Sequence, residues 1–330
     1  MPTLYRTGQR LDHYQILRPL GQGGASRVYL AVDVHTQQEV VLKIPTAEEI
    51  GGAAIFARHV REAALGKRLC HPALQHHLNP DEQRSQAYLV LEYLRGCTLR
   101  AVMQDEAPAL LPQEQVGRII SQVCDALSYV HTQGVIHQDI KPENIFIEET
   151  GEARLLDFGI AHQLAEERHW WSRFTRAPLV GTPDYMAPER LVGQKGSVRS
   201  DVYAVGVVLY EMLCGRTPFQ ETDGFAIVSI HSSHEPPDIL SINPTLSPAL
   251  ATVVMRAIRR DPQRRYASIQ DLQCDLAHID KVNVVSYVPD PPLIGGRYRQ
   301  AISLASLIFL LCCGLIAFGI FAQYIHQLAH

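Results

Sequence analysis

A short polar segment, His137-Gln138-Asp139-Ile140-Lys141-Pro142-Glu143-Asn144, concentrates acidic, amide and amine side chains, and another acid follows in Asp157-Phe158-Gly159. Carboxylate and amide oxygens are the ligands that Mg²⁺ prefers, so Asn144 and Asp157 are candidate metal ligands. The carboxylate of Asp139 can accept a proton from an attacking hydroxyl. The ammonium of Lys141 can stabilise negative charge that develops on a phosphoryl group during its transfer. Together these side chains indicate metal-assisted phosphoryl transfer.

A glycine-rich segment, Gly21-Gln22-Gly23-Gly24-Ala25-Ser26-Arg27-Val28, lies far upstream of these residues. Glycines allow backbone N–H groups to approach a polyphosphate. A hairpin turn accounts for the same glycines, so the segment alone leaves both readings open. A strand is expected after it, whereas a dinucleotide-binding turn needs a helix there, and the Gly-Lys-Ser/Thr of a P-loop is absent.

Lys43 ends the apolar segment Val40-Val41-Leu42, and Glu62 lies on a helix that is expected to follow. One interpretation of Lys43 is an exposed strand end. The other is a cation that holds phosphates and is oriented by the carboxylate of Glu62.

Ala187-Pro188-Glu189 completes a series of motifs that occur in a fixed order along the chain. A chance occurrence of the whole series is negligible. Over residues 12–280 the sequence resembles the eukaryotic-like Ser/Thr protein kinases of bacteria. This resemblance implies transfer of the γ-phosphoryl of ATP to Ser or Thr hydroxyls of other proteins, and of the chain itself. It implies Mg²⁺ as the metal cofactor, with Mn²⁺ as an alternative.

The resemblance also implies a role for each matching residue. Asp139 would be the catalytic base, and Lys141 marks Ser/Thr rather than Tyr specificity. Lys43 and Glu62 would form an activating ion pair. Asn144 and Asp157 would bind the metal. The ATP-binding positions would be Gly21, Gln22, Gly23, Gly24, Ala25, Ser26, Val28, Val41, Lys43, Leu91, Glu92, Leu94 and Phe146.

Other implied roles concern the adenine pocket and the support of the catalytic segment. Leu91 would be the gatekeeper, and the backbone of residues 92–94 would meet adenine. Thr182 would belong to the substrate platform and bridge Asp139 and Lys141. The resemblance further implies that Glu189 pairs with Arg265 and that Asp201 tethers the catalytic segment.

The sequence departs from the family pattern at four positions, one of which is Ser26 in place of the last glycine of the glycine-rich segment. Gln138 replaces an arginine that usually receives a phosphate through charge-assisted bonds. We therefore predict that activity does not depend on phosphorylation of Ser172 or Thr175 in the usual manner. Val41 and Phe146 are larger than the groups common around adenine, which predicts a narrower slot.

Two kinds of periodicity divide the chain into a strand-rich and a helix-rich part. Strands are predicted at 14–20, 27–32, 39–44 and 88–93, and helices at 53–69, 113–132, 200–213, 252–260 and 268–279. Strands followed by helices predict an α+β, bilobal protein kinase fold. The kinase domain would span 12–280, with a β-rich N-lobe over about 12–94 and a helical C-lobe over about 95–280.

The C-terminal part differs in composition. After a linker over 281–300, residues 301–322 carry no charge and are rich in Leu, Ile and Phe. As a helix this segment would be roughly 33 Å long, enough to cross a bilayer. Arg297 and Arg299 precede it, so the positive-inside rule places the kinase domain in the cytoplasm. We expect a single-pass protein of the cell membrane, with a short extracytoplasmic tail at 323–330 and self-association as an alternative role of the span.

Composition and isolated residues narrow the other possibilities. The net charge of −4, with acids and bases intermixed, predicts no nucleic-acid partner, and the seven scattered cysteines argue against a zinc site. His76 and His77 are expected to be solvated. Glu143 is either a surface acid or an attractor for a basic residue N-terminal to the target hydroxyl. An inactive scaffold and a small-molecule kinase remain as competing functions.

Overall fold

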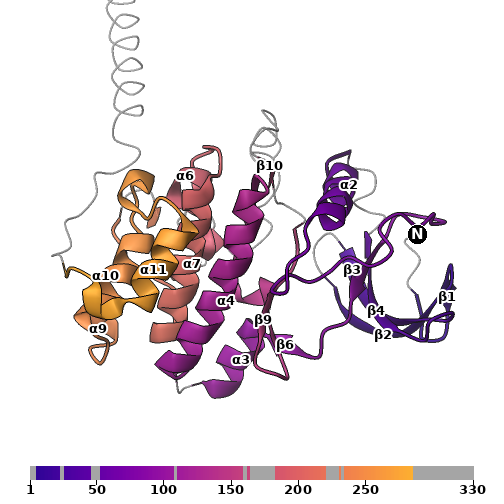
Figure 1. The fold of residues 1–330 in the computed structure, drawn as a ribbon, viewed down its shortest axis with the longest axis horizontal. Helices are drawn as coiled ribbons and strands as arrows, with labels where there is room; N and C mark the ends of the chain where they lie inside the picture. Colours follow the sequence, from indigo (N-terminus) through magenta and orange to yellow (C-terminus); the bar gives the residue numbers. More distant parts are fainter. Residues whose placement is uncertain are drawn as a thin grey trace, which may run out of the picture.

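The computed structural model describes residues 5–22, 26–45, 53–107, 110–158, 162–163, 183–220, 230–231 and 234–284. Figure 1 shows these residues as two lobes, with a twisted sheet in one and a group of helices in the other. The α+β, bilobal architecture expected from the order of strands and helices is therefore confirmed. The predicted membrane span at 301–322 lies outside the described residues. Within the part of the chain that is described, no helix combines the length and apolar character needed to span a bilayer.

The smaller lobe is built on a five-stranded antiparallel sheet in the order β1-β2-β3-β4-β5. Its strands are β1 (Arg10–Leu11), β2 (Tyr14–Gln22), β3 (Ser26–Asp33), β4 (Glu39–Pro45) and β5 (Leu89–Glu92). Successive side chains of a strand point to opposite faces. Val40 and Leu42 therefore join one core cluster, whereas Val41 joins a second cluster with Leu89 and Leu91. Helix α2 (Ala53–Arg68) lies beside the sheet (Figure 1).

The larger lobe is organised around a buried helix. Its helices are α3 (Leu99–Glu106), α4 (Gln113–Thr132), α6 (Pro188–Leu191), α7 (Val198–Cys214), α9 (Ile239–Ile242), α10 (Pro248–Ala257) and α11 (Ile269–Ala277). Every residue of α7 from Ser200 to Leu213 is buried, which explains its nearly continuous apolar sequence. A Cβ on Gly206 would lie 2.7 Å from that of Ala257, so this glycine allows α7 and α10 to pack closely.

Short strands of the larger lobe hold the segments that carry the predicted site residues. They are β6 (Gly96–Thr98), β7 (Val135–Ile136), β8 (Ile145–Glu148), β9 (Ala153–Leu155) and β10 (His162–Gln163). One sheet has the order β6-β8-β9, and β7 pairs with β10. The polar segment 137–144 connects β7 to β8, and Asp157 follows β9 by two residues. Pairing of β8 with β9 therefore brings the two polar clusters together.

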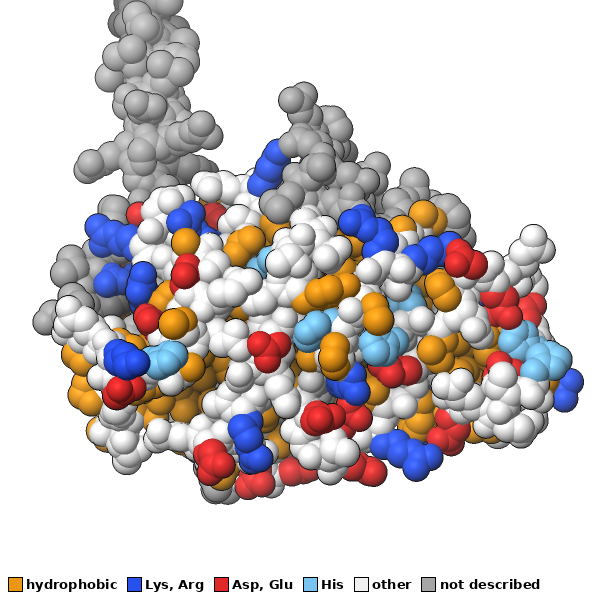
Figure 2. All heavy atoms as spheres, viewed as in Figure 1, with side chains coloured by type: hydrophobic (Ala, Val, Ile, Leu, Met, Phe, Trp, Pro, Cys, Tyr) orange, Lys and Arg blue, Asp and Glu red, His pale blue; other side chains and the backbone are white. Residues whose placement is uncertain are grey.

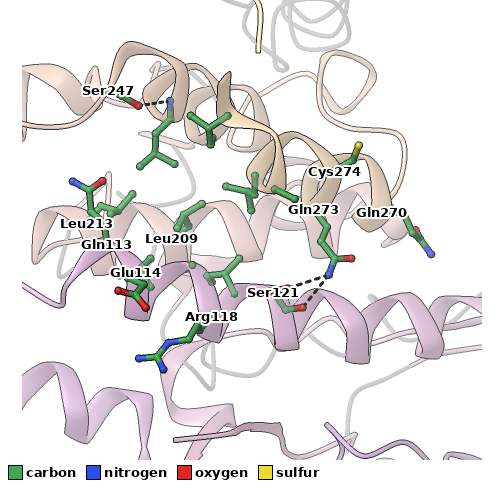
Figure 3. A pocket seen from close by; sticks show the side chains of 17 residues that line it. Gln113, Glu114, Arg118, Ser121, Leu209, Leu213, Ser247, Gln270, Gln273 and Cys274 are labelled. Carbon is green, nitrogen blue, oxygen red and sulfur yellow. Dashed lines mark hydrogen bonds between the residues drawn. The ribbon is translucent and has the colours of Figure 1, made fainter. Parts of the chain in front are cut away.

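A cavity of about 740 Å³ lies among α4, α7, α10 and α11 (Figure 3). Apolar side chains such as Val116, Leu209 and Leu213 form much of its wall. None of the residues that line it has a predicted role in phosphoryl transfer, so this cavity is separate from the predicted site. On the face of the molecule seen in Figure 2, acidic and basic side chains are interspersed over both lobes.

Candidate active site

The loop between β7 and β8 brings three predicted site residues into direct contact. The ammonium of Lys141 lies 2.9 Å from Oδ1 and 3.0 Å from Oδ2 of Asp139. The amide of Asn144, in the 3₁₀ turn η1 (Pro142–Asn144), donates to the backbone oxygen of Asp139 at 2.8 Å and to its Oδ2 at 2.9 Å. The carboxylate of Asp139 is thereby fixed by a cation and an amide, with about a fifth of its side chain exposed.

Asp201, near the start of α7, holds the backbone of this loop as expected. Its Oδ2 accepts the backbone N–H of His137 at 2.9 Å, and its Oδ1 accepts that of Gln138 at 2.9 Å. Nε2 of His131 lies 2.8 Å from the same carboxylate. Burial alone would raise the pKa of Asp201, but these hydrogen bonds and the nearby histidines outweigh burial and lower it. A buried carboxylate thus anchors the loop to the most buried helix.

His137 connects the loop to the segment that carries Asp157. Its Nε2 lies 3.1 Å from the backbone oxygen of Leu156, and its Nδ1 accepts the backbone N–H of Asp139 at 3.3 Å. Complete burial lowers the pKa of this imidazole, so it is neutral and carries its proton on Nε2. The ring of Phe158 packs against it at a centroid distance of 4.9 Å.

Lys43 contacts one carboxylate in each lobe. Its ammonium lies 2.6 Å from Oε1 of Glu62 on α2 and 3.0 Å from Oδ1 of Asp157 in the larger lobe. Burial would lower the pKa of Lys43, but the charges of Asp157 and Glu62 raise it above its usual value. The interpretation of Lys43 as an exposed strand end is therefore wrong, and the ion pair with Glu62 is present.

The oxygens of Asn144 and Asp157 suit the magnesium ion that the family resemblance implies. Both donor contacts of the Asn144 amide go to Asp139, which leaves its carbonyl oxygen as an acceptor. Asp157 contributes a carboxylate whose side chain is 28% exposed, and it adopts a left-handed backbone conformation with φ of 55°. A hard cation with oxygen ligands would be held by this pair, and it would neutralise phosphate charge.

The predicted adenine positions lie where β4 and β5 meet. Val41 pairs in register with Leu91, and both belong to the cluster against which Val28 and Tyr93 pack. Leu94 is buried just beyond. The backbone of Glu92 already has partners, because its N–H donates to His76 at 3.0 Å and its carbonyl accepts from Gln75 at 3.0 Å. An adenine contact there would use the second lone pair of that carbonyl oxygen.

Other ATP-binding positions lie apart from this group. Gly21 pairs with Val28 at the end of the β2–β3 hairpin, and the backbone of Gln22 and Ser26 continues these strands. Gly23, Gly24 and Ala25 lie outside the described residues, so the path of the glycine-rich turn is not described. Phe146 is partly buried on β8, in the sheet of the larger lobe.

Glu189 and Arg265 form a buried, two-pronged ion pair. The two guanidinium nitrogens of Arg265 lie 2.9 Å and 2.8 Å from the two oxygens of Glu189, and Ser200 donates to the same acid at 2.8 Å. Arg265 also donates to three backbone carbonyls. A solvated Arg265 is excluded by this geometry. Thr182, the remaining predicted platform residue, lies outside the described residues.

Three features around this site were not predicted from the sequence. Arg100 on α3 contacts Glu143, two residues beyond Lys141, at 2.8 Å. Arg190 on α6 is buried and, like Gln138, lies against Gly196. His77 packs its ring on α2 at Gly66, so the expectation that it is solvated is wrong; burial lowers its pKa to about 4. The two arginines and the histidine belong to no motif, so the sequence did not indicate their contacts.

Comparisons with known proteins agree with this geometry. The family described as protein kinase domain matches residues 14–276. The serine/threonine-protein kinase PknB of Mycobacterium tuberculosis is 34% identical over 81% of this chain and 43% of its own length. PrkC of Bacillus subtilis is 33% identical over 82% of this chain and 41% of its own length. The chain thus spans about two fifths of these curated relatives.

Solved structures give the same result. The crystal structure of the Mycobacterium tuberculosis PknI kinase domain superimposes with a TM-score of 0.65 at 25% identity, covering 84% of this chain and 100% of that one. The fold, the matched sequence range and the relatives all indicate one assignment. This chain belongs to the protein kinase family.

Proposed function

We propose that the chain is a serine/threonine protein kinase that transfers the γ-phosphoryl of ATP, with Mg²⁺, to hydroxyls of protein substrates and of itself. The observation that carries the proposal is the convergence of Asp139, Lys141 and Asn144 in one loop, with Asp157 held at their edge by Lys43. Each of these side chains has a distinct use in the reaction. No specific observation favours a small-molecule acceptor.

The geometry supports a division of labour. Asp139 is oriented to accept the proton of a substrate hydroxyl, since Lys141 and Asn144 fix its carboxylate. Lys141 is a cation beside the base and can stabilise charge on the phosphoryl group in transfer. Asn144 and Asp157 would hold the magnesium ion, and Lys43 would bind nucleotide phosphates while Glu62 orients it.

Radioactive or mass-spectrometric phosphate transfer by the purified full-length chain tests the proposal. With Mg²⁺ and ATP we expect labelling of the chain and of a generic Ser/Thr substrate protein. Asp139→Asn and Asp157→Ala should each lower the rate by about 10²-fold or more, because each removes a group used in the transition state. Equal labelling by the wild type and both variants, or none by any, would leave a scaffold as the better description.

We further propose that the kinase domain, over about 12–280, is held at the cytoplasmic face of the cell membrane by residues 301–322. Support comes from the uncharged, apolar composition of that segment and from Arg297 and Arg299 before it. Sedimentation of the full chain with bacterial membranes after carbonate washing, compared with a chain ending at 300, tests this. Release of the full chain by carbonate would contradict it.

Independence from loop phosphorylation is also proposed. Gln138 is neutral, and Asp201 fixes its backbone whatever the charge on neighbouring segments. Ser172 and Thr175 lie outside the described residues. Ala replacements at both positions should change kcat by less than about threefold, because position 138 has no cation that could bind a phosphate. A loss of tenfold or more would contradict the proposal.

A further inference from the structure

Arg100, in the first turn of α3, is surrounded by acidic and phenolic oxygens. Its Nε donates to Glu143 at 2.8 Å, its Nη1 to Glu211 at 2.7 Å and its Nη2 to the hydroxyl of Tyr185 at 2.5 Å. Tyr185 in turn donates to the other oxygen of Glu211. All the ends of the guanidinium are therefore engaged by groups from η1, from η2 (Pro183–Tyr185) and from α7.

The site around Arg100 is acidic. The side chain of Glu211 is only 8% exposed, and that of Glu143 is 41% exposed. Burial would lower the pKa of Arg100, but its hydrogen bonds to Glu211 and Glu143 raise it further above its usual value. Asp184 lies near the same group, and burial together with the charge of Glu211 raises its pKa. Arg100 is the cation that both Glu143 and Glu211 contact.

This acidic site lies close to where an acceptor hydroxyl must sit. Glu143 follows Lys141 by two residues, so their Cα atoms are at most about 7.6 Å apart. An extended peptide advances about 3.3 Å per residue. A substrate side chain that reaches Glu143 would therefore come from a residue two or three positions away from the Ser or Thr held at Asp139.

We propose that Arg100 is a built-in occupant of this acidic site and determines specificity by preventing the site from selecting arginine in the substrate. The inference rests on the proposed transfer to Ser and Thr in peptides. Without Arg100, both oxygens of Glu143 and one of Glu211 are acceptors for a substrate guanidinium. Oε2 of Glu143 already has no hydrogen-bond partner in the part of the chain that the structure describes. The geometry that binds Arg100 is the geometry that a substrate arginine would use.

Peptide kinetics on the full-length chain test this. A set of serine peptides is used, and each peptide carries one Arg at a different position between three residues before and three residues after the serine. Each has a matched peptide with Ala at that position. For the wild type we expect kcat/KM ratios of Arg to Ala peptides near one at every position. For Arg100→Ala we expect the ratio to rise about tenfold at one position two or three residues from the serine. A tenfold change in this ratio corresponds to roughly 1.4 kcal/mol. Arg100→Met, which keeps the apolar stem, should show the same gain if the alanine variant folds poorly.

Three controls separate this role from a structural one. Arg100→Lys keeps a cation in the site and should stay near the wild-type ratio. Glu143→Gln combined with Arg100→Ala should abolish the gain, because one carboxylate of the site is gone. Arg118→Ala removes the same charge from an exposed position of α4 and should leave the ratio at one. Free guanidinium ion, which can refill the vacated site, should lower the gained preference of Arg100→Ala.

The outcomes distinguish the two proposals. If wild type and variants phosphorylate the peptides but Arg100→Ala and Arg100→Met show no arginine preference, the inference is overturned and the proposed function stands. If the wild type already prefers arginine tenfold, Arg100 does not block the site and the inference is also overturned. Absence of transfer by every variant and by the wild type overturns the proposed function and this inference with it.

Discussion

Gly66 occupies a tightly packed position on α2, and replacing it by alanine tests how that helix is placed. An alanine Cβ would lie 2.1 Å from Nδ1 and 2.2 Å from Cγ of His77. Cβ atoms in proteins essentially never lie closer than 3.0 Å to a non-bonded heavy atom. Because Cγ is the first ring atom beyond Cβ, the ring cannot avoid the new methyl by turning about χ2 alone. If His77 keeps its χ1 rotamer, either α2 or the His77 segment must move by about 1 Å, a distance set by the 3.0 Å limit.

The expected magnitude follows from two opposing effects. Helix propensity favours alanine over glycine by about 1 kcal/mol in a helix interior. Overpacking costs about 1–3 kcal/mol, so we expect a net loss of about 1 kcal/mol in the free energy of unfolding. Glu62 lies one turn before Gly66 on the same face of α2. A shift of about 1 Å would lengthen its 2.6 Å contact with Lys43 beyond hydrogen-bond distance, and kcat should fall by about 10²-fold.

Urea unfolding and peptide phosphorylation of the full-length variants measure both effects. Gly117→Ala is the matched control, because nothing lies within 4 Å of a Cβ at that position of α4, and alanine there should stabilise by about 1 kcal/mol. His77→Ala added to Gly66→Ala removes the overlap and should restore most of kcat. A Gly66→Ala chain as stable and as active as Gly117→Ala would refute the reasoning.

Three further predictions concern charge in the larger lobe. Arg265→Met leaves the buried carboxylate of Glu189 without its cation and should lower the free energy of unfolding by about 3–5 kcal/mol in urea titrations. Adding Glu189→Leu should recover part of that loss. Burial lowers the pKa of His231 to about 4, so between about pH 6.5 and pH 4 the unfolded chain binds a proton that the folded chain does not. The free energy of unfolding should therefore drop by up to about 1.4 kcal/mol per pH unit as pH falls from about 6.5 to 4. His231→Gln should flatten that slope. Gln138→Arg would place a second cation beside the buried Arg190, since both side chains lie against Gly196. It should lower the free energy of unfolding, measured at the thermal midpoint, by about 2–4 kcal/mol. Arg190→Gln in the same chain should restore it, and no recovery would contradict the shared site.

The sequence predicted those contacts whose residues belong to ordered motifs. The pair of Lys43 and Glu62, the anchoring of the loop by Asp201 and the pair of Glu189 and Arg265 are all found. Each was inferred because a family pattern supplies both partners at once. Long periodic segments were equally informative, and the helix expected at 113–132 is α4 with the same bounds.

Other features depend on which surfaces the fold brings together. Arg100 is separated by 43 residues from Glu143 and by 111 from Glu211, and no local pattern connects them. The burial of His77 depends on α2 lying over it at Gly66, which its own neighbours in sequence do not reveal. Short elements such as α3 and β6 were also missed, because segments of a few residues carry little periodicity.

Gln138 and Asp157 share a property unrelated to their chemistry: both have positive φ, at 67° and 55°. Side chains branched at Cβ are poorly tolerated in that region, whereas Asn and Gly are accepted readily. Mutational scans of this chain will therefore show intolerance at both sites that comes partly from the backbone conformation and partly from the loss of the side chain. Comparing Asn with Val at each position separates them, because Asn keeps the main-chain shape while Val does not.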